Sequence, residues 1–455
     1  MPPRRGRSTS SWPRRSWPRS PACCCSPPCV SNSSKGSPPV PSNTDKLTIT
    51  LWDFTWYTRT GPGEPFADLD AAFAQAVERG YNTVRVCAMP FLLFRSGLDT
   101  TALTFTGLGG GYAQRTRWYD VPGEATIDGR AHLLALFTAA ARHGCRIIVS
   151  SWEYQQSPAF LSVPDWHHAL SSVPPADRAD VLADAHADLV DHVTAHGLAG
   201  QLAFVELHNE VQFGRLADVG SPGEDPLQAL QPYLTAAIDR FKRRHPEVPV
   251  TVNVARVPVG SMRFLPANAD VAVFHPYLNG VLEELHDAFA LRSPDRPFPQ
   301  GLARRELLRD GAPDLDAWWP PDADRWRLDA TVVGHREVYV HDWCDPAKWD
   351  RWLYDRYAVH RHAMRQKLEL WITAAADWAA ANDIPLVLGE GWVGYTPLHG
   401  TFEEGPVGAQ FCREAVGLAS QVGAWGTVVC SNAAPHHPMW HDVALQVELN
   451  REFAG

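Results

Sequence analysis

The chain has 455 residues, of which 45% are hydrophobic and 20% are charged. These fractions lie near the averages of globular proteins, so the chain can bury a sizeable core, and one α/β barrel domain can reach this length. The formal net charge is −10, and no basic cluster follows the first few dozen residues, which argues against nucleic acid as a partner. No apolar run reaches the ~18 to 20 residues that cross a bilayer, so we expect no membrane association.

Residues 1–45 differ in composition from the rest of the chain. They are rich in Arg, Pro and Ser, and they contain four of the nine Cys. A secretory signal needs an apolar segment of ~7 to 15 residues after the positive charges, and this stretch is a poor substitute. We expect a disordered leader at 1–45 and a catalytic domain at 46–455. The five scattered Cys of that domain form neither a metal-type pair nor a disulfide framework. This favours a cytoplasmic location, with secretion through an atypical leader as the alternative.

Eight short apolar or β-branched runs alternate with longer segments of helical periodicity. The runs cover residues 47–52, 82–88, 145–151, 202–208, 248–254, 271–274, 385–389 and 425–431. The helical segments include residues 66–79, 131–143, 176–196, 226–245, 363–381 and 408–421. This alternation is typical of repeated βα units around a parallel sheet, and eight units predict an α/β fold of the (β/α)8 TIM barrel type. The reactive residues of such barrels lie where the strands end and the βα loops begin.

Two carboxylates follow the fourth and seventh predicted strands. Glu210 comes directly after Asn209 at the end of the fourth run, and Glu390 comes directly after the seventh run. Carboxylates at these two strand ends face each other across the mouth of a barrel. A separation of ~5 to 5.5 Å is what a double-displacement glycosidase needs, so this pair predicts the catalytic centre.

Other polar residues lie at the same kind of position. Arg85 belongs to the second run, His275 and Tyr277 follow the sixth, and an aromatic-bearing segment follows the eighth. At these strand ends the sequence resembles the cellulase-type glycoside hydrolases of clan A, family five and its relatives, over residues 47–440. Family-five enzymes commonly carry a His after the third strand, where this chain has Trp152 and Glu153.

The resemblance implies a retaining glycoside hydrolase that acts on β-glycosidic bonds of a carbohydrate substrate without a cofactor or a metal. It implies that Glu210 is the acid/base, that Glu390 is the nucleophile and that Asn209 bonds the sugar 2-hydroxyl. Glu210 must then start protonated, which apolar surroundings and the charge on Glu390 would favour. The oligomeric state and the sugar stay open.

The physical chemistry of the neighbouring side chains predicts supporting roles for them. Arg85 would keep Glu390 ionised, because a positive charge within ~4 to 6 Å lowers the pKa of a carboxyl group. Tyr277 can donate its hydroxyl to Glu390, and His275 can bond a sugar hydroxyl or a carboxylate. The alternatives are a structural salt bridge for Arg85 and a structural His-Pro turn for His275.

Sugar subsites are predicted from acids that stand next to aromatic residues. An indole covers the C–H face of a sugar, and a neighbouring carboxylate accepts hydrogen bonds from the sugar hydroxyls. A capping role is the alternative for the acids. The candidates are Asp53, Trp152 and Glu153, with Trp392 or Trp440 as a sugar platform after the last strands.

A long insertion, residues 279–360, separates the sixth and seventh predicted strands, and it far exceeds an ordinary βα loop. It contains Trp318, Trp319, Trp326, Trp343, Trp349 and Trp352. We expect these indoles to roof the cleft and make the enzyme exo-acting on short oligosaccharides or glycosides. A helical insertion packed on the side of the barrel is the structural alternative.

Two other functions are compatible with the strand-end residues. A metal-dependent sugar isomerase also gathers acids and His at the strand ends of a barrel, but this chain lacks the dense set that octahedral coordination needs. A non-catalytic sugar-binding barrel is the other alternative. The presence of both Glu210 and Glu390 argues against it.

Overall fold

The computed structural model describes residues 46–107, 121, 123–394, 396–397, 399–430 and 433–455. The predicted leader at 1–45 lies outside the described residues, as does Ser431, the last residue of the eighth predicted run. Among the helices of the described ranges, none combines the length and apolarity needed to cross a bilayer.

Nine parallel strands form the central sheet, in the order β7-β6-β5-β2-β1-β11-β10-β9-β8. They confirm the predicted barrel, because every predicted run contains a strand. The strands are β1 (Leu47–Asp53), β2 (Thr83–Cys87), β5 (Arg146–Ser150), β6 (Leu202–Glu206), β7 (Val250–Thr251), β8 (Asn253–Ala255), β9 (Ala272–His275), β10 (Leu386–Leu388) and β11 (Gly426–Val428).

The sheet closes through a strand that is interrupted at one residue. β7 pairs with β6, β8 pairs with β9, and only Val252 separates β7 from β8 in the chain. These two segments are therefore the halves of the fifth barrel strand. All seven residues of β1 and all five of β2 are buried. Burial on both faces explains why these strands read as continuous apolar runs.

Helices surround the strands, and the six predicted helices correspond to α2, α4, α6, α7, α12 and α13. An Asp side chain caps the N-terminus of α2, α4, α7 and α12 by accepting a backbone N–H of the first turn. The helices are α1 (Thr55–Thr58), α2 (Leu69–Glu78), α3 (Pro90–Phe94), α4 (Gly129–Arg142), α5 (Asp165–Ser171), α6 (Arg178–Ala195), α7 (Pro226–Arg244), α8 (Val281–Ala288), α9 (Gln300–Glu306), α10 (Trp326–Asp329), α11 (His335–Trp343), α12 (Pro346–Ala381), α13 (Pro406–Gln421) and α14 (Val443–Ala454). Short 3-10 helices are η1 (Ser157–Phe160), η2 (Pro175–Asp177), η3 (Ala199–Gln201), η4 (Arg215–Val219), η5 (Met262–Phe264), η6 (Leu315–Ala317), η7 (Asp322–Asp324) and η8 (Pro438–His441).

Helix α12 begins at Pro346, well before the predicted start at residue 363, so part of the predicted loop is helical. The side chain of Asp345 accepts hydrogen bonds from the backbone N–H groups of Ala347 and Lys348, at 2.9 and 3.2 Å. An Asp followed by Pro at the first helical position is a helix-start signal that the predicted boundary missed.

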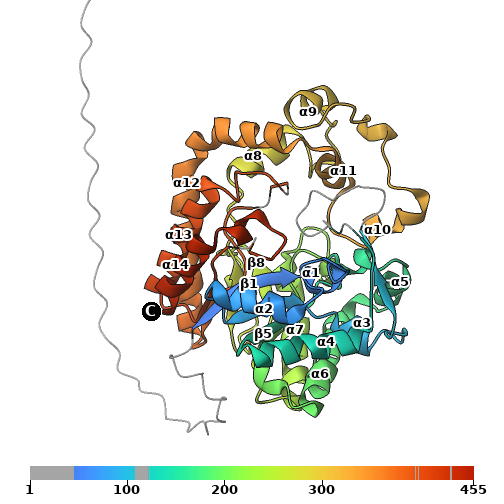
Figure 1. The fold of residues 1–455 in the computed structure, drawn as a ribbon, viewed down its shortest axis with the longest axis vertical. Coiled ribbons are helices and arrows are strands. Elements are labelled where there is room, and N and C mark those ends of the chain that lie inside the picture. The colour runs from blue at the N-terminus through green and yellow to red at the C-terminus, as the bar shows by residue number, and fades with distance from the viewer. Residues whose placement is uncertain (1–45, 108–120, 122, 395, 398, 431–432) are drawn as a thin grey trace, which may run out of the picture. The chain divides into compact units, whose positions relative to one another are not determined.

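The insertion between β9 and β10 carries helices α8, α9, α10 and α11 before α12 begins. Figure 1 shows α9, α10 and α11 gathered at one end of the molecule, at the upper right of the view. A second addition, which the sequence patterns did not predict, is the antiparallel hairpin of β3 (Leu103–Phe105) and β4 (Ala125–Ile127). It lies between β2 and β5 in the chain.

Candidate active site

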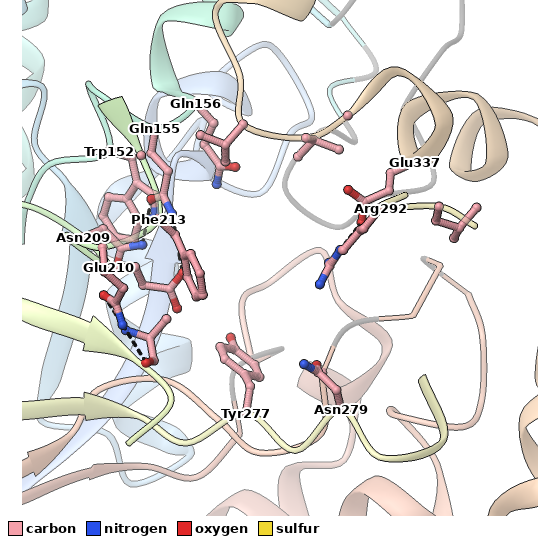
Figure 2. Close-up of a pocket in the computed structure, with 18 of the residues that line it drawn as sticks. Trp152, Gln155, Gln156, Asn209, Glu210, Phe213, Tyr277, Asn279, Arg292 and Glu337 are labelled. Atoms are coloured by element: carbon pink, nitrogen blue, oxygen red, sulfur yellow. Dashed lines mark hydrogen bonds and ion pairs between the residues drawn. The ribbon is translucent and has the colours of Figure 1, made fainter. Parts of the chain in front are cut away.

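A cavity of about 780 Å³ lies at the carboxyl ends of the barrel strands. Residues that follow β5, β6, β8, β9 and β10 all contribute to its wall, as expected for the functional face of this fold. Figure 2 shows the side chains that surround it. The described lining residues include Trp152, Gln155, Gln156, Asn209, Glu210, Phe213, Arg256, Tyr277, Asn279, Arg292, Glu337 and Glu390.

Glu390 follows β10, and donors hold both of its carboxylate oxygens. Arg85 donates from Nη1 to Oε1 at 2.7 Å, and the Tyr277 hydroxyl donates to Oε2 at 3.0 Å. The carboxylate is 8% exposed, so one edge of it reaches the cavity. Its orientation is thus fixed by two charged or polar partners from β2 and from the segment after β9.

Arg85 is fully buried and connects several acceptors. Its guanidinium donates to Glu206 from Nε at 2.9 Å and from Nη2 at 2.7 Å, and it donates to Asn209 Oδ1 at 2.7 Å. Its Cζ lies 4.6 Å from the centroid of the Trp152 ring. Burial by itself would lower the pKa of Arg85, but the charges of Glu206 and Glu390 more than offset that and raise it. The side chain therefore stays a permanent cation behind Glu390.

Glu210 occupies the cavity wall after β6 in a left-handed backbone conformation, with φ of 42°. Its backbone N–H donates to Asn253 Oδ1 at 2.6 Å, which ties this turn to β8. Gln155 Nε2 donates weakly to Glu210 Oε2 at 3.4 Å. Burial raises the pKa of Glu210 to about 7, although the positive charge of Arg85 opposes the rise. At neutral pH much of this carboxyl is therefore protonated.

His275 lies between the two carboxyl groups. Its Nδ1 is 3.2 Å from Glu210 Oε1 and 3.5 Å from Glu390 Oε1. Burial lowers the pKa of His275 to about 4, so the ring is neutral at neutral pH and can donate from Nδ1. One carboxylate oxygen from each Glu and one ring nitrogen of His275 all lie within 4.8 Å of one another.

Among the residues that the structure describes, this trio could also hold a metal ion. Two features oppose that use. Arg85 places a positive charge 2.7 Å from Glu390 Oε1, and Tyr277 already donates to Oε2, so a cation would compete with both. The donor set of two carboxylates and one His is also smaller than octahedral coordination requires.

Glu153, predicted as a subsite acid, lies behind the wall and is not among the described lining residues of the cavity. Its carboxylate accepts the backbone N–H groups of Phe91 and Leu92 at 3.0 and 2.8 Å, at the start of α3. It also accepts from Trp166 Nε1 at 3.2 Å. Burial raises the pKa of Glu153 to about 7, and these hydrogen bonds oppose the rise. The contacts match the capping alternative.

Trp392 and Trp440, the two predicted sugar platforms, make their contacts away from the cavity. Trp392 Nε1 donates to the carbonyl oxygen of Val429 at 2.8 Å, on the side of β11. Trp440 donates to Gln75 Oε1 at 3.0 Å, and the guanidinium of Arg79 stacks on its ring at 4.3 Å. Neither Trp is among the described lining residues, and Asp53, which is 7% exposed, is not among them either. Of the predicted aromatic residues, Trp152 does line the cavity.

The insertion borders the cavity, but not with its indoles. The part of the lining that the structure describes takes Asn279, Leu291, Arg292, Pro294, Val332, Val333, Gly334, His335, Arg336 and Glu337 from it, and no Trp. Trp349 and Trp352 are buried, and Trp318 stacks on His335 with ring centroids 5.2 Å apart. Trp349 packs on His341 and Trp352 on Phe289, with ring centroids 5.0 and 6.0 Å apart, which removes these two indoles from the cleft.

Several residues of the site were not predicted. Glu206 is an acid inside an otherwise apolar run, and such a charge in a buried strand was a signal for a structural ion pair. Arg256 lies two positions past the fifth run, where the strand-end rule used for the other strands would have found it. Gln155, Arg292 and Glu337 lie in loops and in the insertion, and no pattern marks them.

Comparison with known proteins supports the fold and identifies the family. A solved structure of a putative glycoside hydrolase from Parabacteroides distasonis is 18% identical, with a TM-score of 0.64, over 90% of this chain and 94% of that one. A family GH5_18 protein from Streptomyces cattleya, solved in complex with GlcNAc, is 15% identical over 90% of this chain and 81% of that one, with a TM-score of 0.46.

Curated protein sequences give no significant match. The family described as sugar-binding, cellulase-like proteins matches residues 49–286, which is more than half of the chain and includes Arg85, Asn209, Glu210, His275 and Tyr277. The chain belongs to this cellulase-like family.

Proposed function

We propose that the chain is a retaining β-glycosidase in which Glu390 is the nucleophile and Glu210 is the acid/base. The observation that carries the proposal is the short separation of the two carboxyl groups, which have oxygens within 4.8 Å of each other. Retaining enzymes bring these groups to ~5 to 5.5 Å, whereas inverting enzymes need ~6.5 to 9.5 Å to fit a water molecule.

The first step uses Glu390 as the nucleophile and Glu210 as the acid. Arg85 and Tyr277 hold the carboxylate of Glu390 in a fixed orientation, and this carboxylate attacks the anomeric carbon. Glu210, with a pKa of about 7, donates its proton to the glycosidic oxygen as the bond to the aglycone breaks. The products are a free alcohol and a glycosyl ester of Glu390.

The second step reverses the role of Glu210. Formation of the ester removes the negative charge of Glu390, which lowers the pKa of Glu210 and leaves it as a base. Glu210 then takes a proton from water, the hydroxide attacks the anomeric carbon, and the ester bond to Glu390 breaks. The sugar leaves with its original configuration, and Glu210 is protonated again.

The substrate that fits best is a short oligosaccharide or glycoside. A volume of about 780 Å³ falls within the ~300 to 1,000 Å³ of small-molecule sites. Residues of the insertion, among them Leu291 and Glu337, form part of the cavity wall. This wall supports exo action on a chain end.

The test is the configuration of the first product, followed by proton NMR on a panel of aryl β-glycosides. We expect the β-anomer to appear first and the α-anomer only after mutarotation. An α-anomer at early times would overturn the retaining mechanism. A panel that is bound but never hydrolysed would favour the non-catalytic sugar-binding barrel.

A variant test assigns the nucleophile. Glu390→Gly should lose turnover, and azide should restore release from substrates with good leaving groups and give the α-glycosyl azide. Glu369→Gly is the matched control, because Glu369 is exposed on α12, outside the described lining of the cavity. Ordinary activity in Glu390→Gly would show that Glu390 is not the nucleophile.

A further inference from the structure

Arg256 brings an uncompensated positive charge into the wall of the cavity. It follows β8 directly, is half-buried and lines the same cavity as Glu210 and Glu390. Its side chain makes no hydrogen bond or ion pair with the part of the chain that the structure describes. A partly desolvated guanidinium without an acceptor is unfavourable unless a ligand supplies one.

The backbone conformation and one backbone hydrogen bond fix the position of Arg256. Its φ of 62° is left-handed, a conformation that non-glycine residues adopt at a cost of ~1 to 3 kcal/mol and that is enriched at functional sites. The backbone N–H of Arg256 donates to the carbonyl oxygen of His275 at 2.7 Å. This bond joins Arg256 to the segment that carries the site's central His.

A second guanidinium enters the cavity from the insertion. Arg292 donates from Nε to Glu337 Oε1 at 2.9 Å, which orients its planar group. Figure 2 shows the Arg292 side chain extending into the cavity from the wall opposite Glu210. The charges of both Arg256 and Arg292 lower the pKa of Glu210, so both cations act on the site electrostatically.

The positive charges of Arg256 and Arg292 contrast with the negative net charge of the chain. The formal net charge is −10, so the protein as a whole repels an anionic ligand. Two guanidinium groups line the cavity despite this net charge, and guanidinium is the side-chain group that best matches the planar oxygens of carboxylate, sulfate and phosphate. Glu337 provides part of the counter-charge for Arg292, while Arg256 has no such partner among the described residues.

We propose that Arg256 and Arg292 bind an anionic group of the substrate, so that the enzyme acts on saccharides that carry a carboxylate, a sulfate or a phosphate. This inference rests on the proposed glycosidase function and names its substrate class. The alternative is that Arg256 donates to neutral sugar hydroxyls, which would give no preference for charge.

The experiment compares matched substrates in turnover. Aryl β-glucosides and β-mannosides are each paired with the corresponding uronide, 6-sulfate and 6-phosphate, which distinguishes the three anions. We expect kcat/KM for at least one anionic member to exceed that of its neutral parent by about tenfold or more, the size of one good charge-assisted contact. Arg256→Gln should remove most of this preference, and Arg256→Lys should restore part of it. If Arg256→Gln lowered kcat/KM equally for the anionic substrates and their neutral parents, the proposal would be overturned.

A binding arm separates this proposal from the glycosidase assignment. Titration calorimetry of the same glycosides with Glu390→Gln measures affinity without turnover, at low and at high salt. Anionic members should bind more tightly, and Arg256→Gln in that background should abolish the difference. Arg305→Gln is the matched control, because Arg305 is exposed on α9, outside the described lining. If charged and neutral glycosides bind equally, the proposal fails even where the enzyme is active.

A third readout is specific to the charge of Arg256. With a neutral substrate, Arg256→Gln should move the alkaline limb of the kcat/KM profile to higher pH, because the lost positive charge had lowered the pKa of Glu210. A purely structural defect would reduce the rate without moving this limb. An unmoved limb would contradict the electrostatic role.

Discussion

Arg85 Nη1 donates to Glu390 Oε1 at 2.7 Å, although the two residues lie 305 positions apart in the chain. The bond joins β2 to the segment that follows β10, and these two strands are not neighbours in the sheet. The same guanidinium binds Glu206, so one buried cation is shared by two carboxylates. This contact links the stability of the barrel to the chemistry of its mouth.

Replacing Arg85 by Met should destabilise the fold and abolish activity together. The change leaves the charges of Glu206 and Glu390 without their cation, and loss of one partner of a buried ion pair costs ~3 to 5 kcal/mol. Urea unfolding measures this cost. Arg365→Met is the control, since Arg365 pairs with Glu414 at the surface, where a pair contributes ~0 to 1 kcal/mol. If both variants lowered the free energy of unfolding equally, the buried network around Arg85 would be contradicted.

Replacing Glu210 by Ala should slow glycosides with poor leaving groups far more than activated aryl glycosides. Only a poor leaving group needs a proton to depart. General acid catalysis contributes ~10²- to 10⁴-fold to the rate, so the loss on poor leaving groups should exceed the loss on activated ones by about this factor. The measurement is kcat/KM across a series of aglycones of rising pKa. The same loss on every member of the series would rule out the acid role.

The wild-type kcat/KM should fall as the pH rises through about 7. Burial raises the pKa of Glu210 to about 7, so the protonated acid is present below that pH and is lost above it. With an activated substrate, Glu210→Ala should remove this limb of the pH profile. A limb that persists in the variant would belong to another group.

Replacing Glu153 by Ala should lower stability and leave KM unchanged. The variant strips the acceptor from the backbone N–H groups of Phe91 and Leu92, and each unsatisfied buried donor costs ~1 to 3 kcal/mol. Glu153→Gln keeps one acceptor oxygen, so its free energy of unfolding should lie between those of Glu153→Ala and the wild type. A raised KM at an unchanged unfolding midpoint would mean that Glu153 binds sugar after all.

An enzyme with a wall formed by the insertion should shorten oligosaccharides from one end. We expect a reduced oligosaccharide series to lose one terminal unit at a time, because residues of the insertion, among them Leu291 and Glu337, line the cavity. Chromatography of the products at early times gives the answer. Early fragments of middle length would mean that the groove is open at both ends.

The sequence by itself determined the barrel and the centre of the candidate site. Parallel strands buried on both faces read as apolar runs, and the barrel brings all their carboxyl ends to one face. Residues one or two positions past a run therefore converge whatever the loops do. Glu210, Glu390 and His275 are brought together in this way, and Arg85 contacts Glu390 from within the second run.

Only the tertiary structure decided which other candidates reach the cavity. Glu153 and Trp440 also follow strands, but a side chain in a loop takes the direction set by its local turn and by the nearest unsatisfied partner. For Glu153 that partner is the start of α3, and for Trp440 it is Gln75 on α2. The position of Arg292 depends in the same way on the folded insertion, because Arg292 is oriented by Glu337, and these residues are 45 positions apart in the chain.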